Sequence, residues 1–245
     1  MRRMHAQLSG LGIPYKRIAA VDARTVPDEE VASHFAAKGL FGRVPKGDQC
    51  CTLSHVQFYR DLLATGARYG LVLEDDVELR PQARDLLSDL SWLPSEVSLL
   101  KVEAIVPVVL AGKLAPVGGG FSVAPLKSKH SGTGAYIIER SLAAWILETV
   151  KIWPITIDHM LFNPHVSPIF KAARPYQLIP AIATQPNAKE DTDIDEWRRA
   201  QRRPGMRSWK RSFKRGFSDI AAFPKQLFDV AIGRSRLVRI AVIRS

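Results

Sequence analysis

A helix, a short loop and an apolar strand that runs into three acidic residues form the most constraining stretch of this 245-residue sequence. Apolar residues recur at three-to-four-residue spacing after Asp48, which can cap a helix, and Gly66 stands where a left-handed C-terminal cap is wanted. The apolar residues 71–73 follow, and the acids 74–76 come directly after them. In open α/β sheets, ligands bind beyond the carboxyl ends of strands. The stretch therefore predicts an α/β fold with three carboxylates at the edge of a site.

The remaining pattern of the first 197 residues favours one open sheet flanked by helices. Helices are predicted over 2–12, 27–39 and 140–150 and after Pro81, and strands over 15–21, 97–102 and 134–138. Three consecutive glycines, 118–120, and several prolines make 103–132 loop-rich, with room for a hairpin that serves as a binding-site flap or as a plain connection. Residues 155–162 are expected to place Asp158 and His159 in a turn.

Charge divides the chain after Trp197. The sequence carries 35 basic and 24 acidic residues, a net charge of +11, yet residues 198–245 hold 14 Lys or Arg and only Asp219 and Asp229 as acids. Residues 1–197 are left with 21 basic and 22 acidic side chains. Hydrophobic residues make up 46% of the chain, enough to bury one substantial core. We therefore predict one globular domain over 1–197 and a basic tail over 198–245 with an anionic partner of its own.

The basic tail has the pattern of an amphipathic helix. From Gly205 onward, apolar residues recur at steps of four, four and three with Lys and Arg between them: Trp209, Phe213, Phe217 and Ile220. Pro224 should end or kink this helix, and 227–243 is a second apolar and basic piece that would extend the contact. The pattern favours an anionic membrane interface over a terminal helix packed on the domain. No nucleic-acid partner is expected, because nothing else resembles a nucleic-acid-binding module.

The cysteines and the hydropathy bear on location. Cys50 and Cys51 are the two cysteines of the chain, and a disulfide between neighbours would close a strained eight-membered ring, so reduced thiols in the cytosol fit better. No stretch reaches the roughly 18 uncharged apolar residues of a membrane span, and no apolar run of a signal peptide follows Met1. We expect a cytoplasmic protein that lies peripherally at the inner face of the cytoplasmic membrane.

Glu74, Asp75 and Asp76 repel one another unless a cation or a basic group lies beside them. Their hard oxygen ligands suit Mn²⁺ or Mg²⁺. A solvated turn at the end of a strand is the competing interpretation, but the strand and the preceding helix favour a site. A divalent cation held there would neutralise a diphosphate and stabilise it as a leaving group, so the predicted chemistry is transfer of the group that the diphosphate carries.

Three further positions carry groups that can do chemistry. Ser54 and His55 are neighbours in a helix and point about 100° apart, so they make no triad, and His55 either hydrogen-bonds near the acids or is a satisfied, partly buried histidine. Asp158 offers a general base or a further metal ligand, with a helix N-cap as the alternative. Lys101 and Arg140 are also candidates, as phosphate partners, but ordinary surface charge explains each equally well, and the prediction places no weight on them.

Several of these segments together resemble the lipooligosaccharide-type glycosyltransferases of family 25. The two most specific are Gly-Asp-Gln-Cys-Cys-Thr-Leu-Ser-His at 47–55 and Tyr-Gly-Leu-Val-Leu-Glu-Asp-Asp-Val at 69–77. Further matches, in order, are 18–23, 132–138, 154–159 and 180–185, so that the resemblance spans about residues 2–190.

The resemblance implies a glycosyltransferase-A-like α/β fold, a nucleotide-diphosphate sugar donor (often UDP-galactose), and acceptors in bacterial surface glycolipid or polysaccharide. The implied enzyme is a hexosyltransferase. By position, Glu74 and Asp76 match the metal motif, and Asp158 is chosen as the catalytic base that deprotonates the acceptor hydroxyl for an in-line, inverting attack. Substrate binding is carried over to four residues: Ser54, His55, Asp75 and Thr133.

The beginning of the sequence departs from the family pattern. Family members usually begin with an apolar strand and an Asn-Leu-containing loop ahead of an Arg-Arg-rich helix, whereas this sequence opens at Arg2-Arg3. A version of the sheet without that first strand is therefore expected, through a late start codon or in an impaired protein. The departure motivates a second hypothesis, a non-catalytic nucleotide-sugar-binding or membrane-attached scaffold.

Overall fold

The structure is a computed structural model that describes residues 2–185, 224 and 226–240. Its helices are α1 (Arg2–Leu11), α2 (Asp28–Ser33), α3 (Lys46–Thr65), α4 (Ala83–Ser88), α5 (Arg140–Thr149), α6 (Ile157–Phe162) and α7 (Pro168–Ala173). Its strands are β1 (Tyr69–Leu73), β2 (Glu78–Leu79), β3 (Leu99–Lys101), β4 (Val108–Ala111), β5 (Ala115–Gly118), β6 (Phe121–Pro125), β7 (Ala135–Glu139), β8 (Tyr176–Ile179), β9 (Ala183–Thr184) and β10 (Arg236–Arg239). The amphipathic helix predicted from Gly205 falls on residues 205–223, which lie outside the described part of the chain.

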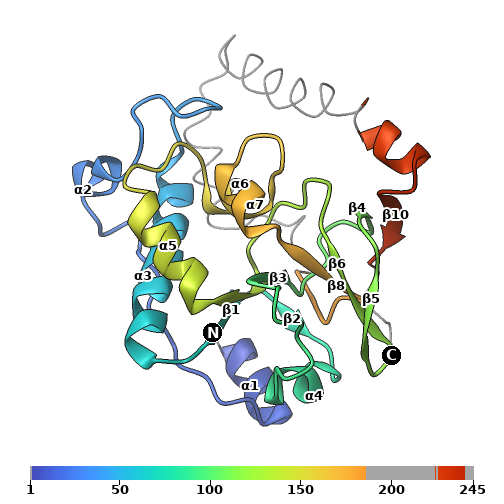
Figure 1. The fold of residues 1–245 in the computed structure, drawn as a ribbon. Coiled ribbons are helices and arrows are strands. Elements are labelled where there is room, and N and C mark those ends of the chain that lie inside the picture. Colours follow the sequence, from blue (N-terminus) through green and yellow to red (C-terminus); the bar gives the residue numbers. More distant parts are fainter. Residues whose placement is uncertain (1, 186–223, 225, 241–245) are drawn as a thin grey trace.

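Six strands form one open sheet in the order β1-β7-β3-β8-β6-β5, which confirms the predicted α/β architecture. Only β3 and β8 run parallel within it, and the other neighbours are antiparallel. The strand β1 lies at one edge, and no described strand pairs on its outer side. Figure 1 shows α3 and α5 side by side against the sheet, with α1 and α4 gathered elsewhere along it.

The sheet is buried on both faces, and β7 shows how. Tyr136 and Ile138 point into the core that α3, α5 and α6 cover, whereas Ala135 and Ile137 point into the core that α1 and α4 cover. All four side chains are almost inaccessible to solvent. Because successive side chains of a strand alternate between faces, burial on both sides requires the continuous apolar run that the sequence displays. Each large aliphatic side chain buried in this way contributes about 1.5–3 kcal/mol.

The helix α3 comes directly before β1 in the sequence, and the residues at its two ends explain where it begins and ends. Gly66 adopts φ 73° at the C-terminal cap, as predicted. Asp48 does not cap the helix, because Pro45 holds the cap position and α3 begins at Lys46. Asp48 instead lies in the first turn, where its charge still interacts favourably with the helix dipole.

Near the N-terminus, one predicted element was wrong and a second is shorter than predicted. Residues 15–21 form no strand: they are mostly exposed, and they pair with no strand that the structure describes. The helix predicted over 27–39 ends at Ser33, because the chain turns to lie against the loop before α6. Phe35 there forms a parallel bridge with Trp153, and the Leu40 amide donates to the carbonyl of Pro154. Long-range contact overrides helix propensity in this segment.

The loop-rich segment contains a hairpin, and part of the tail joins the domain. The strands β5 and β6 pair around the 118–120 turn, whose three glycines all have positive φ. The strand β10, from the tail, pairs antiparallel with β4, and Ile240 beyond it is fully buried. The second tail piece, predicted as part of a membrane-contacting extension, therefore packs in part on the domain.

A substitution at Gly39 tests how the 35–42 loop packs against the chain at Pro154. A Cβ at Gly39 would stand 2.2 Å from the carbonyl oxygen of Pro154, a backbone atom that cannot rotate away. We expect Gly39→Ala to lower the free energy of unfolding by about 1–3 kcal/mol, measured by urea denaturation. Gly10→Ala is the matched control, because nothing lies within 4 Å of its Cβ and alanine suits a helix. Equal stabilities for the two variants would contradict the packing.

Candidate functional site

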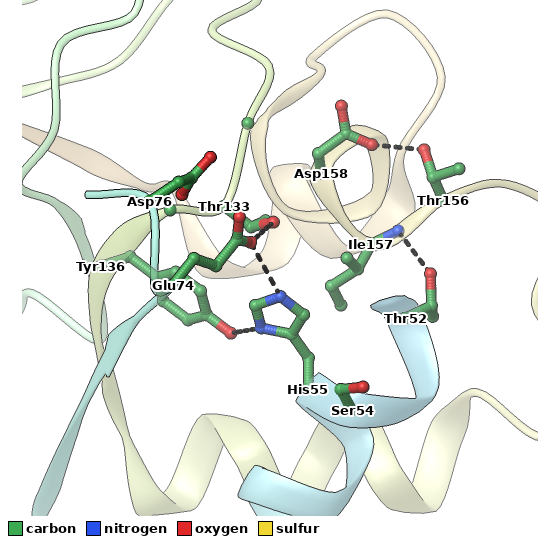
Figure 2. A network of polar contacts seen from close by, with 12 residues as sticks. Thr52, Ser54, His55, Glu74, Asp76, Thr133, Tyr136, Thr156, Ile157 and Asp158 are labelled. Carbon is green, nitrogen blue, oxygen red and sulfur yellow. Dashed lines mark hydrogen bonds and ion pairs between the residues drawn. The ribbon is translucent and has the colours of Figure 1, made fainter. Parts of the chain in front are cut away.

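Glu74 is the centre of the polar network at the carboxyl end of β1 (Figure 2). Its backbone amide donates to the carbonyl of Gly134 at 2.8 Å. Its Oε1 accepts the Thr133 hydroxyl at 2.9 Å and lies 3.3 Å from Nε2 of His55. Burial alone would raise the pKa of Glu74, but the hydrogen bonds and charge of its neighbours, His55 foremost, bring it below its ordinary value of 4.5.

His55 supports Glu74 from inside the protein. It comes from the buried face of α3 and is only 5% exposed. Its Nδ1 lies 2.8 Å from the Tyr136 hydroxyl, which lies 3.0 Å from the hydroxyl of Tyr59. Burial raises the pKa of both tyrosines, so both remain protonated. The two tyrosines thereby fix the imidazole ring, and the ring fixes the carboxylate.

Gln185 joins Glu74 to Asp76. The side-chain Nε2 of Gln185 lies 3.3 Å from Oε2 of Glu74 and 2.9 Å from Oδ1 of Asp76. Burial raises the pKa of Asp76, the hydrogen bond from Gln185 opposes that rise, and the neighbouring charges of Glu74 and Asp75 add to it. Negative charge is therefore crowded where the two carboxylates meet.

Two of the predicted substrate-binding residues lie outside this junction. Asp75 is exposed in the turn after β1. Ser54 points away from Glu74 (Figure 2). Its hydroxyl accepts the backbone amide of Val21 at 2.9 Å and donates to the carbonyl of Cys50 at 2.8 Å. Ser54 therefore anchors the 15–21 segment to α3, which is the contact that replaces the predicted strand pairing.

Asp158 lies in the first turn of α6, across the network from Glu74, rather than in the predicted turn or at the N-cap, which Thr156 occupies. The Thr156 hydroxyl donates to its Oδ1, and the Gly132 amide hydrogen-bonds the same carboxylate. Burial raises the pKa of Asp158, but the charge of His159 and these hydrogen bonds outweigh burial and bring the pKa below its ordinary value. The Ile157 amide donates to Thr52 Oγ1 at 3.2 Å and so fixes α6 to α3.

A buried ion pair beneath the site was missed by the sequence analysis, which considered Lys101 as a phosphate partner or a surface charge. Lys101 and Glu103 are both 0% exposed. The Lys101 Nζ lies 2.6 Å from Glu103 Oε1 and donates to the Gly132 carbonyl at 2.5 Å, while the Gly134 amide donates to Glu103 Oε1 at 3.0 Å. The pair therefore grips the peptide groups on both sides of Thr133. Burial raises the pKa of Glu103 against the opposing charge of Lys101.

Glycine is required on both sides of Thr133. Gly132 has φ 95°, and a Cβ there would stand 2.0 Å from Cδ1 of Ile105. A Cβ on Gly134 would stand 2.6 Å from Glu103 Oε2 and 2.8 Å from the Gln185 amide. The absence of side chains lets the strand approach the ion pair and lets Glu103 and Gln185 both lie close to Gly134.

Two sets of potential metal ligands share Glu74. Among the described residues, Cys51, His55 and Glu74 form one group whose ligand atoms lie within 4.8 Å of one another. Both nitrogens of His55 already contact protein groups, so we interpret that set as a structural support for Glu74 and not as a metal site. The oxygens of Glu74 and Asp76 converge instead on an amide nitrogen, and hard oxygen ligands suit Mg²⁺ or Mn²⁺.

Comparison with known proteins fits this geometry. A sequence model described as glycosyltransferase family 25 (LPS biosynthesis protein) matches residues 1–161, more than half of the chain. The chain belongs to glycosyltransferase family 25. This agrees with the resemblance seen in the 47–55 and 69–77 segments, which supply His55 and Glu74 to the network.

Individual relatives are named for lipooligosaccharide or lacto-N-neotetraose biosynthesis. The lipooligosaccharide biosynthesis protein lex-1 of Haemophilus influenzae is 30% identical over 153 residues, which cover 57% of this chain and 49% of lex-1. The lacto-N-neotetraose biosynthesis glycosyltransferase LgtB of Neisseria gonorrhoeae is 28% identical, covering 71% and 62%. LgtE of Neisseria meningitidis serogroup B is 27% identical, covering 82% and 79%. The chain thus spans about half of lex-1 and under two thirds of LgtB.

The contacts that lower the pKa of Glu74 predict that its carboxylate contributes to the stability of this family 25 chain in a pH-dependent way. Because the folded-state pKa is lowered, the stabilisation is fully present above pH 4.5 and is lost as pH falls through the folded-state value. We expect Glu74→Gln to be less stable than wild type at pH 7 and the difference to shrink below about pH 4.5. Urea unfolding in EDTA measures it, with Glu148→Gln on exposed α5 surface as baseline. A difference that grows on acidification would contradict the assignment.

The buried pair makes a second prediction. Lys101→Met leaves the Glu103 carboxylate buried without its cation, and we expect a loss of about 3–5 kcal/mol in the free energy of unfolding. The double variant Lys101→Met/Glu103→Gln removes both charges and should recover part of that loss, since Gln still accepts from the Gly134 amide. Chemical denaturation of the three proteins measures the coupling. Strictly additive losses would show that the two side chains do not act as a pair.

Proposed function

We propose that this chain is a metal-dependent hexosyltransferase that moves a hexose, galactose in the first instance, from a nucleotide-diphosphate sugar to a cell-surface glycolipid or polysaccharide. The observation that carries the proposal is the meeting of Glu74 and Asp76 on one amide nitrogen, with Asp158 held to Gly132 across the site. Glu74 and Asp76 offer carboxylates for a cation that would bind a diphosphate. Asp158 offers a carboxylate that would accept a proton. Membership of family 25 supports glycosyl transfer as the reaction.

The residues present fit a hard divalent cation, Mn²⁺ or Mg²⁺. Glu74 and Asp76 would hold it through carboxylate oxygens, where both meet Gln185. The buried Glu103 Oε2 has no hydrogen-bond partner among the described residues and, like the Gln185 amide, lies close to Gly134. Such a cation neutralises a donor diphosphate and stabilises it as a leaving group. Asp75, exposed beside the two ligands, is assigned to the donor.

Asp158 is assigned the role of general base. Its lowered pKa keeps the carboxylate ionised at neutral pH, ready to accept the proton of an acceptor hydroxyl. The acceptor oxygen attacks the anomeric carbon, a new glycosidic C–O bond forms, and the C–O bond to phosphate breaks in line with the attack. The electron pair leaves with the nucleoside diphosphate, and the anomeric carbon is inverted. Thr133 and His55 keep Glu74 oriented during this exchange.

The names of the relatives support a lipooligosaccharide-type acceptor. Two are lacto-N-neotetraose biosynthesis glycosyltransferases, and lex-1 is a lipooligosaccharide biosynthesis protein. An acceptor of that kind carries sugar hydroxyls on a lipid anchor. We therefore assign a hydroxyl of a growing surface oligosaccharide as the nucleophile and UDP-galactose as the first donor to test.

We also propose that the tail region meets an anionic membrane from the cytoplasmic side. Phe228 and Leu237 are 60% and 73% exposed, and the exposed Arg234, Arg236 and Arg239 lie among them. Apolar side chains with interleaved arginines suit a lipid interface in which the apolar groups insert and the cations meet phosphate. None of the described helices combines the length and hydropathy of a transmembrane span.

Asp76→Asn tests the proposed chemistry. The substitution keeps the shape of the side chain and removes the charge that would hold the cation, so we expect Mn²⁺-dependent release of UDP from UDP-galactose, with a lipooligosaccharide acceptor, to fall by about 10²–10³-fold. Asp85→Asn, on an exposed turn of α4, is the matched control and should retain wild-type turnover. Undiminished turnover in Asp76→Asn would remove the carboxylates from the mechanism.

Asp158→Asn distinguishes the proposed enzyme from a non-catalytic scaffold. We expect kcat to fall by about 10²–10⁴-fold with little change in UDP affinity, measured by calorimetry. Tight UDP binding by the wild-type chain without transfer to any acceptor would instead favour a non-catalytic nucleotide-sugar-binding or membrane-attached scaffold.

A further inference from the structure

The amide nitrogen of Gln185 lies where the proposed cation would be expected. It donates to Oε2 of Glu74 and to Oδ1 of Asp76, so one neutral N–H₂ group answers two carboxylates. The hydrogens of a neutral carboxamide NH₂ carry only partial positive charges, which compensate the two carboxylate charges incompletely. The junction of Glu74 and Asp76 therefore keeps a net negative charge while the Gln185 amide lies there.

A third, independent group points to the same place. Glu103 is 0% exposed, and its Oε2 has no hydrogen-bond partner among the described residues. A Cβ on Gly134 would stand 2.6 Å from this oxygen and 2.8 Å from Nε2 of Gln185. The unpartnered carboxylate oxygen and the amide thus lie close to the same point beside Gly134. A buried anionic oxygen without a partner is energetically unfavourable unless a donor or a cation meets it.

The fold delivers Gln185 to this position by backbone pairing. The strands β2 and β9 are antiparallel, with Glu78 opposite Thr184. One residue further along, Gln185 faces the chain that has just left Asp76. The Glu103 backbone also bridges to Ala183, so the strand that carries Gln185 is fixed to both acidic segments.

We propose that Gln185 is an exchangeable ligand of the cation site: its NH₂ group holds the cation-free junction together, and rotation of the amide presents Oε1 to the bound cation. The inference rests on the proposed function and deepens it. Both states use the same side chain, because a carboxamide has a donor on one side and a hard oxygen acceptor on the other. Gly134 permits the amide to lie there, because a Cβ at this position would stand 2.8 Å from the amide nitrogen.

Three substitutions at Gln185 separate the donor and acceptor halves of this role. Gln185→Met removes both, Gln185→Glu keeps a hard oxygen and removes the donor, and Gln185→Lys places a permanent ammonium among the carboxylates. Gln57→Lys, on the exposed face of α3, is the matched control. The probe is Mn²⁺ alone, titrated into the full chain without nucleotide and followed by electron paramagnetic resonance of the free ion, and thermal unfolding is recorded in EDTA.

We expect Gln185→Met to weaken Mn²⁺ binding by about 10–100-fold and Gln185→Lys to weaken it further, with Gln185→Glu retaining affinity near wild type. In EDTA, Gln185→Glu should unfold at a lower temperature than wild type, because it adds a third carboxylate, and Gln185→Lys should not. Wild-type Mn²⁺ affinity in both Gln185→Met and Gln185→Lys would overturn the inference and leave the proposed function intact. Failure of the wild-type chain to bind Mn²⁺ at all would overturn both.

Discussion

The buried pair of Lys101 and Glu103 is the interaction on which the geometry of the site depends. Its two side chains lie at the end of β3 and hold the peptide groups on either side of Thr133. Thr133 and the Gly134 carbonyl in turn hold Glu74. Lys101 also lies 4.3 Å over the ring of Phe162, at the end of the helix that carries Asp158. A buried ion pair adds little net stability over apolar packing, so its value here lies in fixing one arrangement of three chain segments.

Glu74 and Asp76 differ in how much of their bonding capacity the protein uses. Glu74 receives Thr133 and His55 on one oxygen and shares Gln185 on the other. Asp76 meets Gln185 through a single oxygen, and burial, with a smaller addition from neighbouring negative charge, raises its pKa. Glu74 is therefore the positioned member of the two, and Asp76 has more capacity for a ligand. Adjacent acids that look equivalent in sequence thus acquire distinct roles from the strand geometry after β1.

The sequence predicted elements whose signals are local. The α3 periodicity, the Gly66 cap, the apolar strand and the acids after it depend on neighbours along the chain, and these are found in the structure. Long-range features escaped prediction. The 15–21 segment carries strand-like residues but pairs with none of the strands in the described part of the chain, and Lys101 alternates with apolar residues in a way that does not distinguish a buried ion pair from a surface charge. Gln185 belongs to the site only because β9 pairs with β2, which no local pattern encodes.

The site is assembled largely from backbone contacts, and this explains why its supporting residues are hard to read from sequence. Gly132 and Gly134 contribute a carbonyl and an amide to the ion pair, and each is required to lack a side chain. The conformation of Gly132, at φ 95°, is one that other residues rarely adopt. A change of either glycine would therefore displace Thr133 without altering any group that does chemistry. The precision of the carboxylate junction resides in this three-residue segment as much as in the acids themselves.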